Sequence, residues 1–131
     1  MNPTQLMAKP IGRVENGADE STALDHWTSV ESRIVLDPSL VGGLSGLEAG
    51  QDIIVVFWFD RSGGFDLLQH PKGDTSRPKR GVFALRSPHR PNPIGVSQVH
   101  LLAVEGNVLL VRGLDAFNGT PVLDVKPVNH P

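Results

Sequence analysis

Residues 81–97 read GVFALRSPHRPNPIGVS and form the most distinctive stretch of the sequence. The stretch opens with apolar and aromatic residues that are typical of strands, namely Val82, Phe83 and Leu85. Three prolines then fall within six residues, at Pro88, Pro91 and Pro93. Proline ends a helix or an interior strand and favours extended backbone in the residue before it. The stretch therefore predicts a strand that leads into a stiff, extended loop.

The predicted loop carries side chains that form strong hydrogen bonds: Arg86, His89, Arg90 and Asn92. A stiff loop with cationic and amide groups suits an anion or a nucleotide, because a rigid segment loses little conformational entropy on binding. Loops also carry much of the binding and catalysis in proteins. The alternative, from the residues alone, is a rigid crossover that only connects two strands.

Short strands separated by turns surround this stretch. The strongest covers residues 52–60, DIIVVFWFD, whose apolar run predicts burial on both faces, or one face on the core and one on a partner. Other predicted strands cover 11–14, 32–36, 96–104, 107–111 and 121–125. Asp37 and Pro38 predict the start of a short helical turn. Many short strands with little helix predict a small all-β barrel with short helical turns.

Residues 15–30 are polar and lack a clear period, so they are predicted to form a loop with at most one helical turn. Trp27 stands out in this loop. Its indole is expected either to dock on the core or to cover a ligand.

The chain has 131 residues, of which 39% are hydrophobic and 20% charged, as in an ordinary globular protein. This length predicts a single domain over residues 1–131, with residues 1–10 as a flexible lead-in. The sequence contains no cysteine, no apolar run of membrane-spanning length and no apolar signal-peptide core near its start. These features predict a cytoplasmic protein without disulfides.

Charge is unevenly distributed along the chain, although the net charge is only −2. Residues 1–60 contain nine acidic side chains and three basic ones, whereas residues 72–90 contain six basic side chains and a single acidic one. A basic segment of this kind attracts phosphate groups. The alternative is a solvated loop that is basic without a binding role.

A family resemblance covers nearly the whole chain. The run Arg90–Ser97, preceded by Gly81–Ala84 and Arg86–Ser87, resembles the signature of the TsaA-like, or TrmO-like, domain family. A second match begins at Leu114–Asp115 and continues over Gly119–Pro127. The resemblance implies a β-barrel that works as a homodimer, with its cofactor site at the dimer interface. It also implies S-adenosylmethionine as cofactor and methylation of tRNA at N6 of threonylcarbamoyl-adenosine, next to the anticodon.

The resemblance also implies roles for individual residues. The implied cofactor contacts are Asp60, Arg61, Arg86, Val96, Arg112, Gly113, Leu114 and Asp115. The basic segment and the proline loop themselves predict substrate contacts at Lys79, Arg80, His89 and Arg90. Asn92 is the predicted catalytic residue, which would form a hydrogen bond with the methyl acceptor, and the alternative is that it only ties the loop to the barrel. Many members have His-Gln where this chain has Asp60-Arg61. Asp115 has an alternative role as a turn residue, because it is followed by Asn118 and Gly119.

Two departures keep other functions open. Larger family members continue well past the Lys126-Pro127 motif, whereas this chain stops at Pro131 without such an extension. Val128 also replaces a tyrosine that many members have. The alternatives are a small-molecule methyltransferase and a non-catalytic barrel that binds S-adenosylmethionine or RNA. The five histidines lack metal-binding spacing, so no metal site is predicted.

Overall fold

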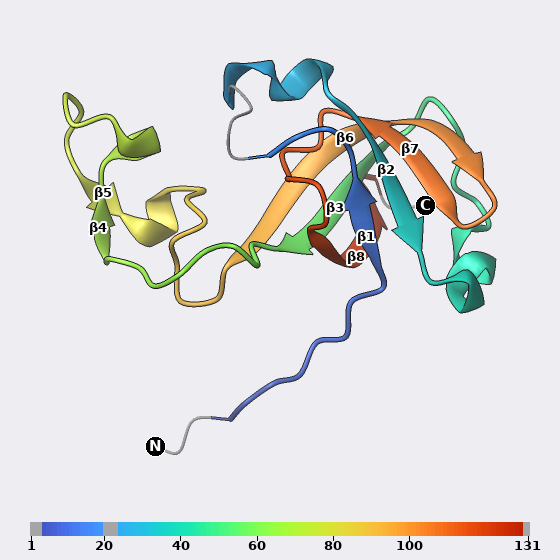
Figure 1. Ribbon diagram of the computed structural model, residues 1–131, viewed down its shortest axis with the longest axis horizontal. Helices are drawn as coiled ribbons and strands as arrows, with labels where there is room; N and C mark the ends of the chain where they lie inside the picture. The colour runs from blue at the N-terminus through green and yellow to red at the C-terminus, as the bar shows by residue number, and fades with distance from the viewer. Residues whose placement is uncertain (1–3, 20–23, 130–131) are drawn as a thin grey trace.

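Six antiparallel strands close into a barrel in the computed structural model, which describes residues 4–19 and 24–129 (Figure 1). Around the barrel the order is β1-β2-β7-β6-β3-β8, and β1 pairs with β8 to close it. The barrel strands are β1 (Gly12–Glu15), β2 (Glu31–Leu36), β3 (Asp52–Trp58), β6 (Ile94–Glu105), β7 (Val108–Arg112) and β8 (Pro121–Pro127). The predicted all-β barrel is therefore confirmed.

The barrel core follows from the alternation of side chains along each strand. In β3, Ile53, Val55 and Phe57 are buried, and the residues between them face outward. Burial of one large apolar side chain contributes about 1.5–3 kcal/mol. Core residues on the other strands include Val14, Ile34, Leu36, Val99, Leu101, Leu109, Val111 and Val122.

Short 3-10 turns connect the strands. They are η1 (Leu24–Ser29), η2 (Pro38–Leu44), η3 (Pro71–Gly73) and η4 (Val82–Ala84). The predicted cap of η2 is confirmed, because the Asp37 carboxylate accepts a 3.0 Å hydrogen bond from the backbone N–H of Ser39. This bond and a second one from the Ser39 hydroxyl lower the pKa of Asp37.

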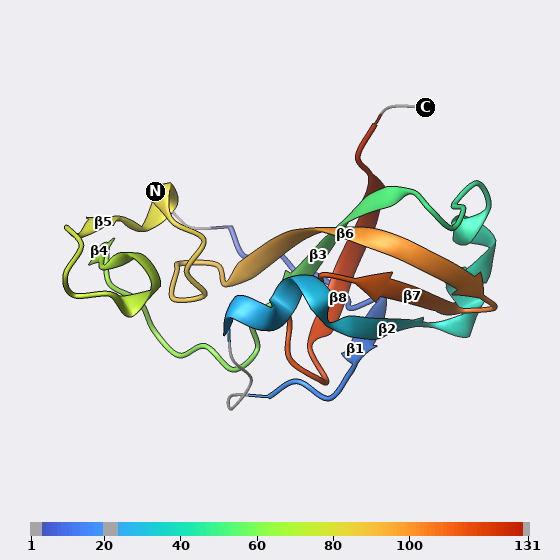
Figure 2. The same ribbon diagram turned by 90° about the horizontal axis from the view of Figure 1, so that it is seen from above.

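Residues 59–93 form a lobe that projects from one end of the barrel (Figures 1 and 2). Its only regular sheet in the described chain is the pair β4 (Leu68–Gln69) and β5 (Arg80–Gly81). The strand predicted over Val82–Leu85 was wrong, because the N–H of Leu85 bonds the carbonyl of Val82 and closes the turn η4. Few side chains are buried in the lobe, and the lobe therefore has little core of its own.

The segment that precedes η1 lies partly outside the described residues, which omit 20–23. Within η1, Trp27 is buried, and its ring packs on Phe117 with the ring centroids 5.7 Å apart. The indole therefore docks on the core, the first of the two predicted placements. Residues 4–10 lead into β1 as an exposed extended segment (Figure 1).

Candidate functional site

The proline loop, residues 86–93, is held by hydrogen bonds within itself. Arg90 Nη1 donates to the carbonyl oxygens of Leu85 at 3.0 Å and Ser87 at 3.1 Å. The backbone N–H of His89 donates to Ser87 Oγ at 3.1 Å. The half-buried Arg90 side chain thus fixes the shape of the loop, and its predicted contact with substrate stays a prediction.

Two side chains from elsewhere in the lobe also hold the proline loop. Ser62 Oγ donates to the carbonyl of Pro88 at 2.9 Å, and Gln69 Nε2 donates to the carbonyl of His89 at 2.6 Å. Neither residue was singled out from the sequence. Each lies at least twenty residues from its partner, and no local pattern signals such a contact.

Arg86 and Asn92 are two side chains of this loop whose polar groups are all available. Both are exposed, and neither makes a side-chain hydrogen bond or ion pair with residues 4–19 or 24–129. A guanidinium and an amide on a rigid loop can therefore bind a ligand without first breaking internal contacts.

Gly95 explains why the motif continues with glycine after the loop. It lies in β6 opposite Phe57 of β3, and a Cβ at this position would lie 2.4 Å from the Phe57 ring. The Phe57 ring in turn packs edge-on against Phe59, with centroids 5.1 Å apart. The absence of a side chain at Gly95 therefore lets two aromatic rings support the start of β6.

The end of the barrel that faces the lobe carries a second cluster. Arg61 Nη2 donates to the carbonyl of Asn118 at 2.7 Å, and its guanidinium lies 5.2 Å from the centre of the Phe117 ring. Phe117 also packs on Trp27, whose buried Nε1 has no hydrogen-bond partner in the described chain. Asp60 precedes Arg61 and is exposed.

Asp115 lies in the same β7–β8 connection as Phe117 and Asn118. Partial burial raises the pKa of its carboxyl, and the charge of Lys72 opposes this shift only in part. The carboxyl accepts no hydrogen bond from residues 4–19 or 24–129. A partly desolvated carboxylate without a donor suits a cation or a hydroxyl group of a ligand.

Not all of the remaining predicted cofactor residues expose a side chain to a ligand at the lobe-facing end of the barrel. Leu114 is fully buried in the barrel core, so its side chain is not exposed in the isolated chain, and its cofactor contact stays a prediction. Gly113 has a φ of +94°, which glycine adopts readily, and its N–H bonds the carbonyl of Val30. Val96 and Arg112 lie on the outer wall of the barrel.

The outer wall carries an apolar strip next to the lobe. We call this the outer strip: Ile54, Val56 and Trp58 of β3 with Ile94 and Val96 of β6. Trp58 pairs with Ile94 and Val56 with Val96, and the two β6 side chains are 41% and 45% exposed. The lobe also exposes large apolar residues, namely Phe65, Leu67, Leu68 and Phe83.

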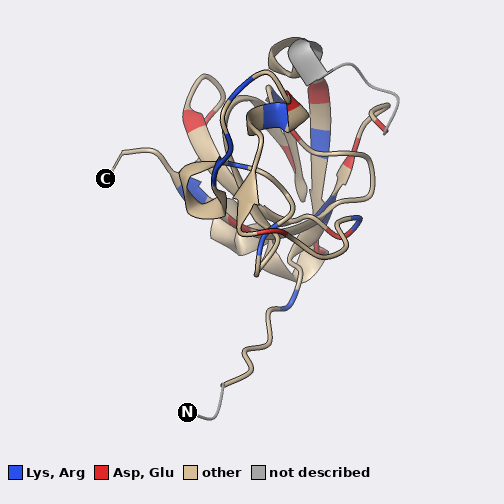
Figure 3. Ribbon diagram, turned by 90° about the vertical axis from the view of Figure 1, so that its left-hand side faces the viewer, with Lys and Arg blue, Asp and Glu red and all other residues tan. Residues whose placement is uncertain are grey.

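The lobe is also strongly basic. It contains seven of the twelve Lys and Arg residues and three of the fourteen Asp and Glu residues, which leaves five basic and eleven acidic residues elsewhere. Figure 3 views the molecule from the lobe side, and basic segments cross this face. The predicted substrate residues Lys79 and Arg80 are exposed here.

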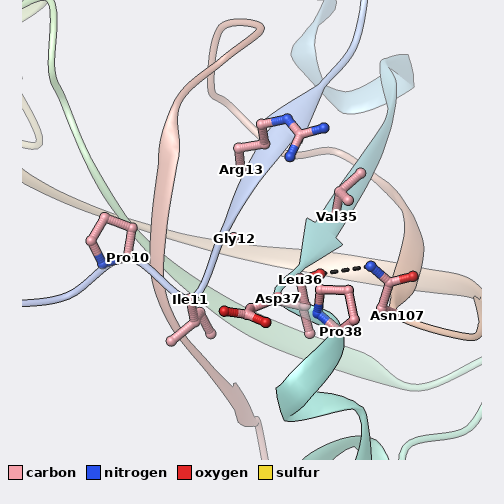
Figure 4. Close-up of a pocket in the computed structure, with 9 residues that line it drawn as sticks. All are labelled: Pro10, Ile11, Gly12, Arg13, Val35, Leu36, Asp37, Pro38 and Asn107. Atoms are coloured by element: carbon pink, nitrogen blue, oxygen red, sulfur yellow. Dashed lines mark hydrogen bonds between the residues drawn. The ribbon is translucent and has the colours of Figure 1, made fainter.

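Two hollows lie away from these clusters. One, of about 450 Å³, is lined by Pro10, Ile11, Gly12, Arg13, Val35, Leu36, Asp37, Pro38 and Asn107 (Figure 4). The other, of about 500 Å³, is lined by Gly50, Gln51, Asp52, His100, Pro127, Val128 and Asn129. Neither is lined by a predicted site residue.

The described residues hold no group of three or more His, Asp or Glu side chains placed to bind a metal ion. Across residues 4–19 and 24–129, no helix has the length and apolar character needed to cross a membrane.

Comparison with known proteins shows the family. Residues 21–130 match the model of the tRNA-methyltransferase O N-terminal domain. The chain belongs to this family. It is 38% identical over 130 residues to a probable S-adenosyl-L-methionine-binding protein of Methanothermobacter thermautotrophicus, covering 97% of this chain and 93% of that protein. It is 33% identical over 135 residues to the human tRNA (adenine(37)-N6)-methyltransferase, covering 93% of this chain and 30% of the human protein.

The fold is similar to that of a solved family member. The crystal structure of TrmO from Pseudomonas aeruginosa matches with a TM-score of 0.76 and 31% identity, covering 96% of this chain and 57% of that chain. The present chain thus spans little more than half of the solved TrmO chain. The predicted family is confirmed, and the relatives support the predicted cofactor and the predicted class, a methyltransferase.

Proposed function

We propose that the protein is an S-adenosylmethionine-dependent methyltransferase that acts on tRNA in the cytoplasm, at N6 of threonylcarbamoyl-adenosine next to the anticodon. The main support for the proposal is the structure of the proline loop in a chain that belongs to the TrmO family. Most polar groups of this loop fix its shape, while Arg86 and Asn92 are left exposed and unbonded within the described chain. Preorganised groups of this kind favour catalysis by positioning.

The residues at the lobe-facing end fit the cofactor by chemical type. Arg86 offers a guanidinium for the cofactor carboxylate, and Asp115 offers a carboxylate for its cation, amine or ribose hydroxyls. Exposed apolar residues such as Val96 and Phe83 offer walls for the adenine. The bound cofactor supplies an electrophilic methyl group on a sulfonium.

A second copy of the chain would complete the site, as the family resemblance implies. Most of the predicted cofactor residues are exposed in the isolated chain, and the outer strip, which includes Val96, is unusually apolar for a solvent-facing barrel wall. Charge favours contact between the basic lobe of one copy and the acidic barrel of another, whereas two lobes would repel each other. We therefore propose a homodimer with the cofactor at its interface.

The basic charge of the lobe supports RNA as the substrate, because Lys and Arg side chains attract the phosphate backbone. A second candidate function is binding of S-adenosylmethionine without methylation of tRNA. It is favoured by a relative of almost the same length that is named only as a probable S-adenosyl-L-methionine-binding protein.

Titration calorimetry with S-adenosylmethionine tests the proposed site. We expect the wild type to bind, and Arg86→Ala to bind at least about tenfold more weakly, because a charge-assisted hydrogen bond contributes about 1.5–3 kcal/mol. The melting temperature of this variant should be unchanged, since Arg86 holds no other described residue. Arg33→Ala on the barrel wall is the matched control. Absence of both heat and thermal stabilisation at millimolar cofactor would contradict the site.

A further inference from the structure

The proline loop contains a histidine, His89, whose hydrogen bonds favour one tautomer of its ring. Ser62 Oγ lies 2.9 Å from the carbonyl oxygen of Pro88 and 3.2 Å from Nδ1 of His89. A serine hydroxyl has one proton to donate, and a carbonyl oxygen can only accept. Both contacts are hydrogen bonds at the same time only if the hydroxyl donates to Pro88 and Nδ1 of His89 donates to the hydroxyl. Neutral His89 therefore carries its proton on Nδ1.

This tautomer leaves Nε2 as the basic atom of the ring. His89 is exposed, and Nε2 has no partner among residues 4–19 and 24–129. The backbone of His89 is fixed on both sides, by Ser87 Oγ at its N–H and by Gln69 Nε2 at its carbonyl. The structure thus presents a fixed, accessible proton acceptor three residues before Asn92.

We propose that Nε2 of His89 accepts the proton that the methyl acceptor loses, an inference that rests on the proposed function. The acceptor nitrogen bonds to the methyl carbon while the carbon–sulfur bond breaks and leaves its electron pair on sulfur. The N–H proton passes to Nε2, and the resulting imidazolium returns it to water. A base at this point matters because a nitrogen next to a carbonyl is a weak nucleophile.

Two other assignments fit the geometry less well. Ser62 is a poor candidate for a nucleophile activated by His89, because its proton is directed to Pro88 rather than to the imidazole. His70 is held in the same tautomer by the carbonyl of Arg77, 2.7 Å from its Nδ1, but it lies outside the proline loop. His70 therefore serves as the matched control for His89.

The tautomer can be tested without activity. In nitrogen-15 NMR spectra of the cofactor-free protein, at a pH where the rings are neutral, we expect the proton of His89 on Nδ1. Ser62→Ala should shift the His89 signals toward the other tautomer and leave those of His70 unchanged. A wild-type His89 protonated on Nε2 would overturn the inference.

Chemical rescue tests the role in proton transfer. His89→Ala should slow tRNA methylation by at least about a hundredfold, the lower range for general-base catalysis, with unchanged cofactor affinity. Added imidazole should restore part of the rate, while His70→Ala should have normal activity without it. Suppose that the wild type methylates tRNA. A His89→Ala variant that is equally active, or one that is slow and not rescued by imidazole, would then overturn this inference alone. Wild type that binds cofactor but methylates no tRNA would overturn the proposed function and this inference together.

Discussion

Asn92 is the single residue whose free amide most directly links the proline loop to function. Asn92→Ala should lower the methylation rate by about a hundredfold or less, the scale of one lost transition-state donor. Cofactor affinity and melting temperature should change little, because the side chain bonds nothing in the described chain. Steady-state rates, calorimetry and thermal melts check these expectations.

Asn107→Ala provides the contrast for Asn92. Its amide donates to the carbonyl of Leu36 at 2.7 Å, so its loss should lower stability by about 1 kcal/mol while the rate of the folded fraction stays normal. If Asn92→Ala instead behaved like Asn107→Ala, with a lower melting temperature and a normal rate, its role would be structural.

Asp115 should show a conflict between stability and binding. Its pKa is raised above the ordinary 3.8, so the folded state binds more protons than the unfolded state in the window just above that value. The contribution of the Asp115 carboxyl to the free energy of unfolding therefore falls as the pH rises through this window. Asp115→Asn should raise the melting temperature at neutral pH and weaken cofactor binding. A variant that is less stable at neutral pH and binds normally would show that Asp115 only shapes the turn.

For individual residues, the sequence predicts which side chains lie together, but not which contacts each side chain makes. The proline motif places Arg86, His89, Arg90 and Asn92 on one loop, as expected. Arg90 instead donates to two loop carbonyls, because the loop turns back on itself within five residues. Leu114 enters the core because the chain folds over the barrel end after β7. Both outcomes depend on tertiary folding rather than on local pattern.

The lobe is the element that should contact RNA. Charge reversal at Lys79 and Arg80 should weaken binding of all tRNAs about equally, because contacts to the phosphate backbone carry no sequence information. Wild-type affinity should fall steeply with salt concentration, and the slope should be smaller in the variant. Reversal of Arg13 and Arg33 on the barrel wall is the control. A tRNA affinity that changes neither with salt concentration nor with the charge reversals in the lobe would favour a small-molecule substrate.

The elements of the barrel were more predictable than those of the lobe. Apolar runs and alternation predicted the barrel strands to within a few residues, because each strand buries one face in a shared core. The lobe has little core of its own, and the Val82 N–H donates to the carbonyl of Leu67 where the chain turns into η4. The apolar residues from Val82 onward therefore lacked the partner strand that their strand preference requires.

At the scale of the whole molecule, the outer strip should be covered by a second copy. Val96 is 45% exposed on this strip, so Val96→Asp would place an unpaired charge in the proposed interface. We expect the wild type to sediment as a dimer and the variant as a folded monomer with weakened cofactor binding. Leu40→Asp, at a similarly exposed position on η2, is the control. A monomeric wild type that binds cofactor fully would contradict the shared site.

The most direct test of methyl transfer to tRNA is the mass of tRNA nucleosides before and after incubation with protein and S-adenosylmethionine. We predict that threonylcarbamoyl-adenosine is converted to a nucleoside heavier by one CH₂ group, only when both protein and cofactor are present. Transfer RNA that lacks the threonylcarbamoyl group should be unchanged. Unaltered nucleosides from a protein that demonstrably binds the cofactor would contradict the assignment as a tRNA methyltransferase.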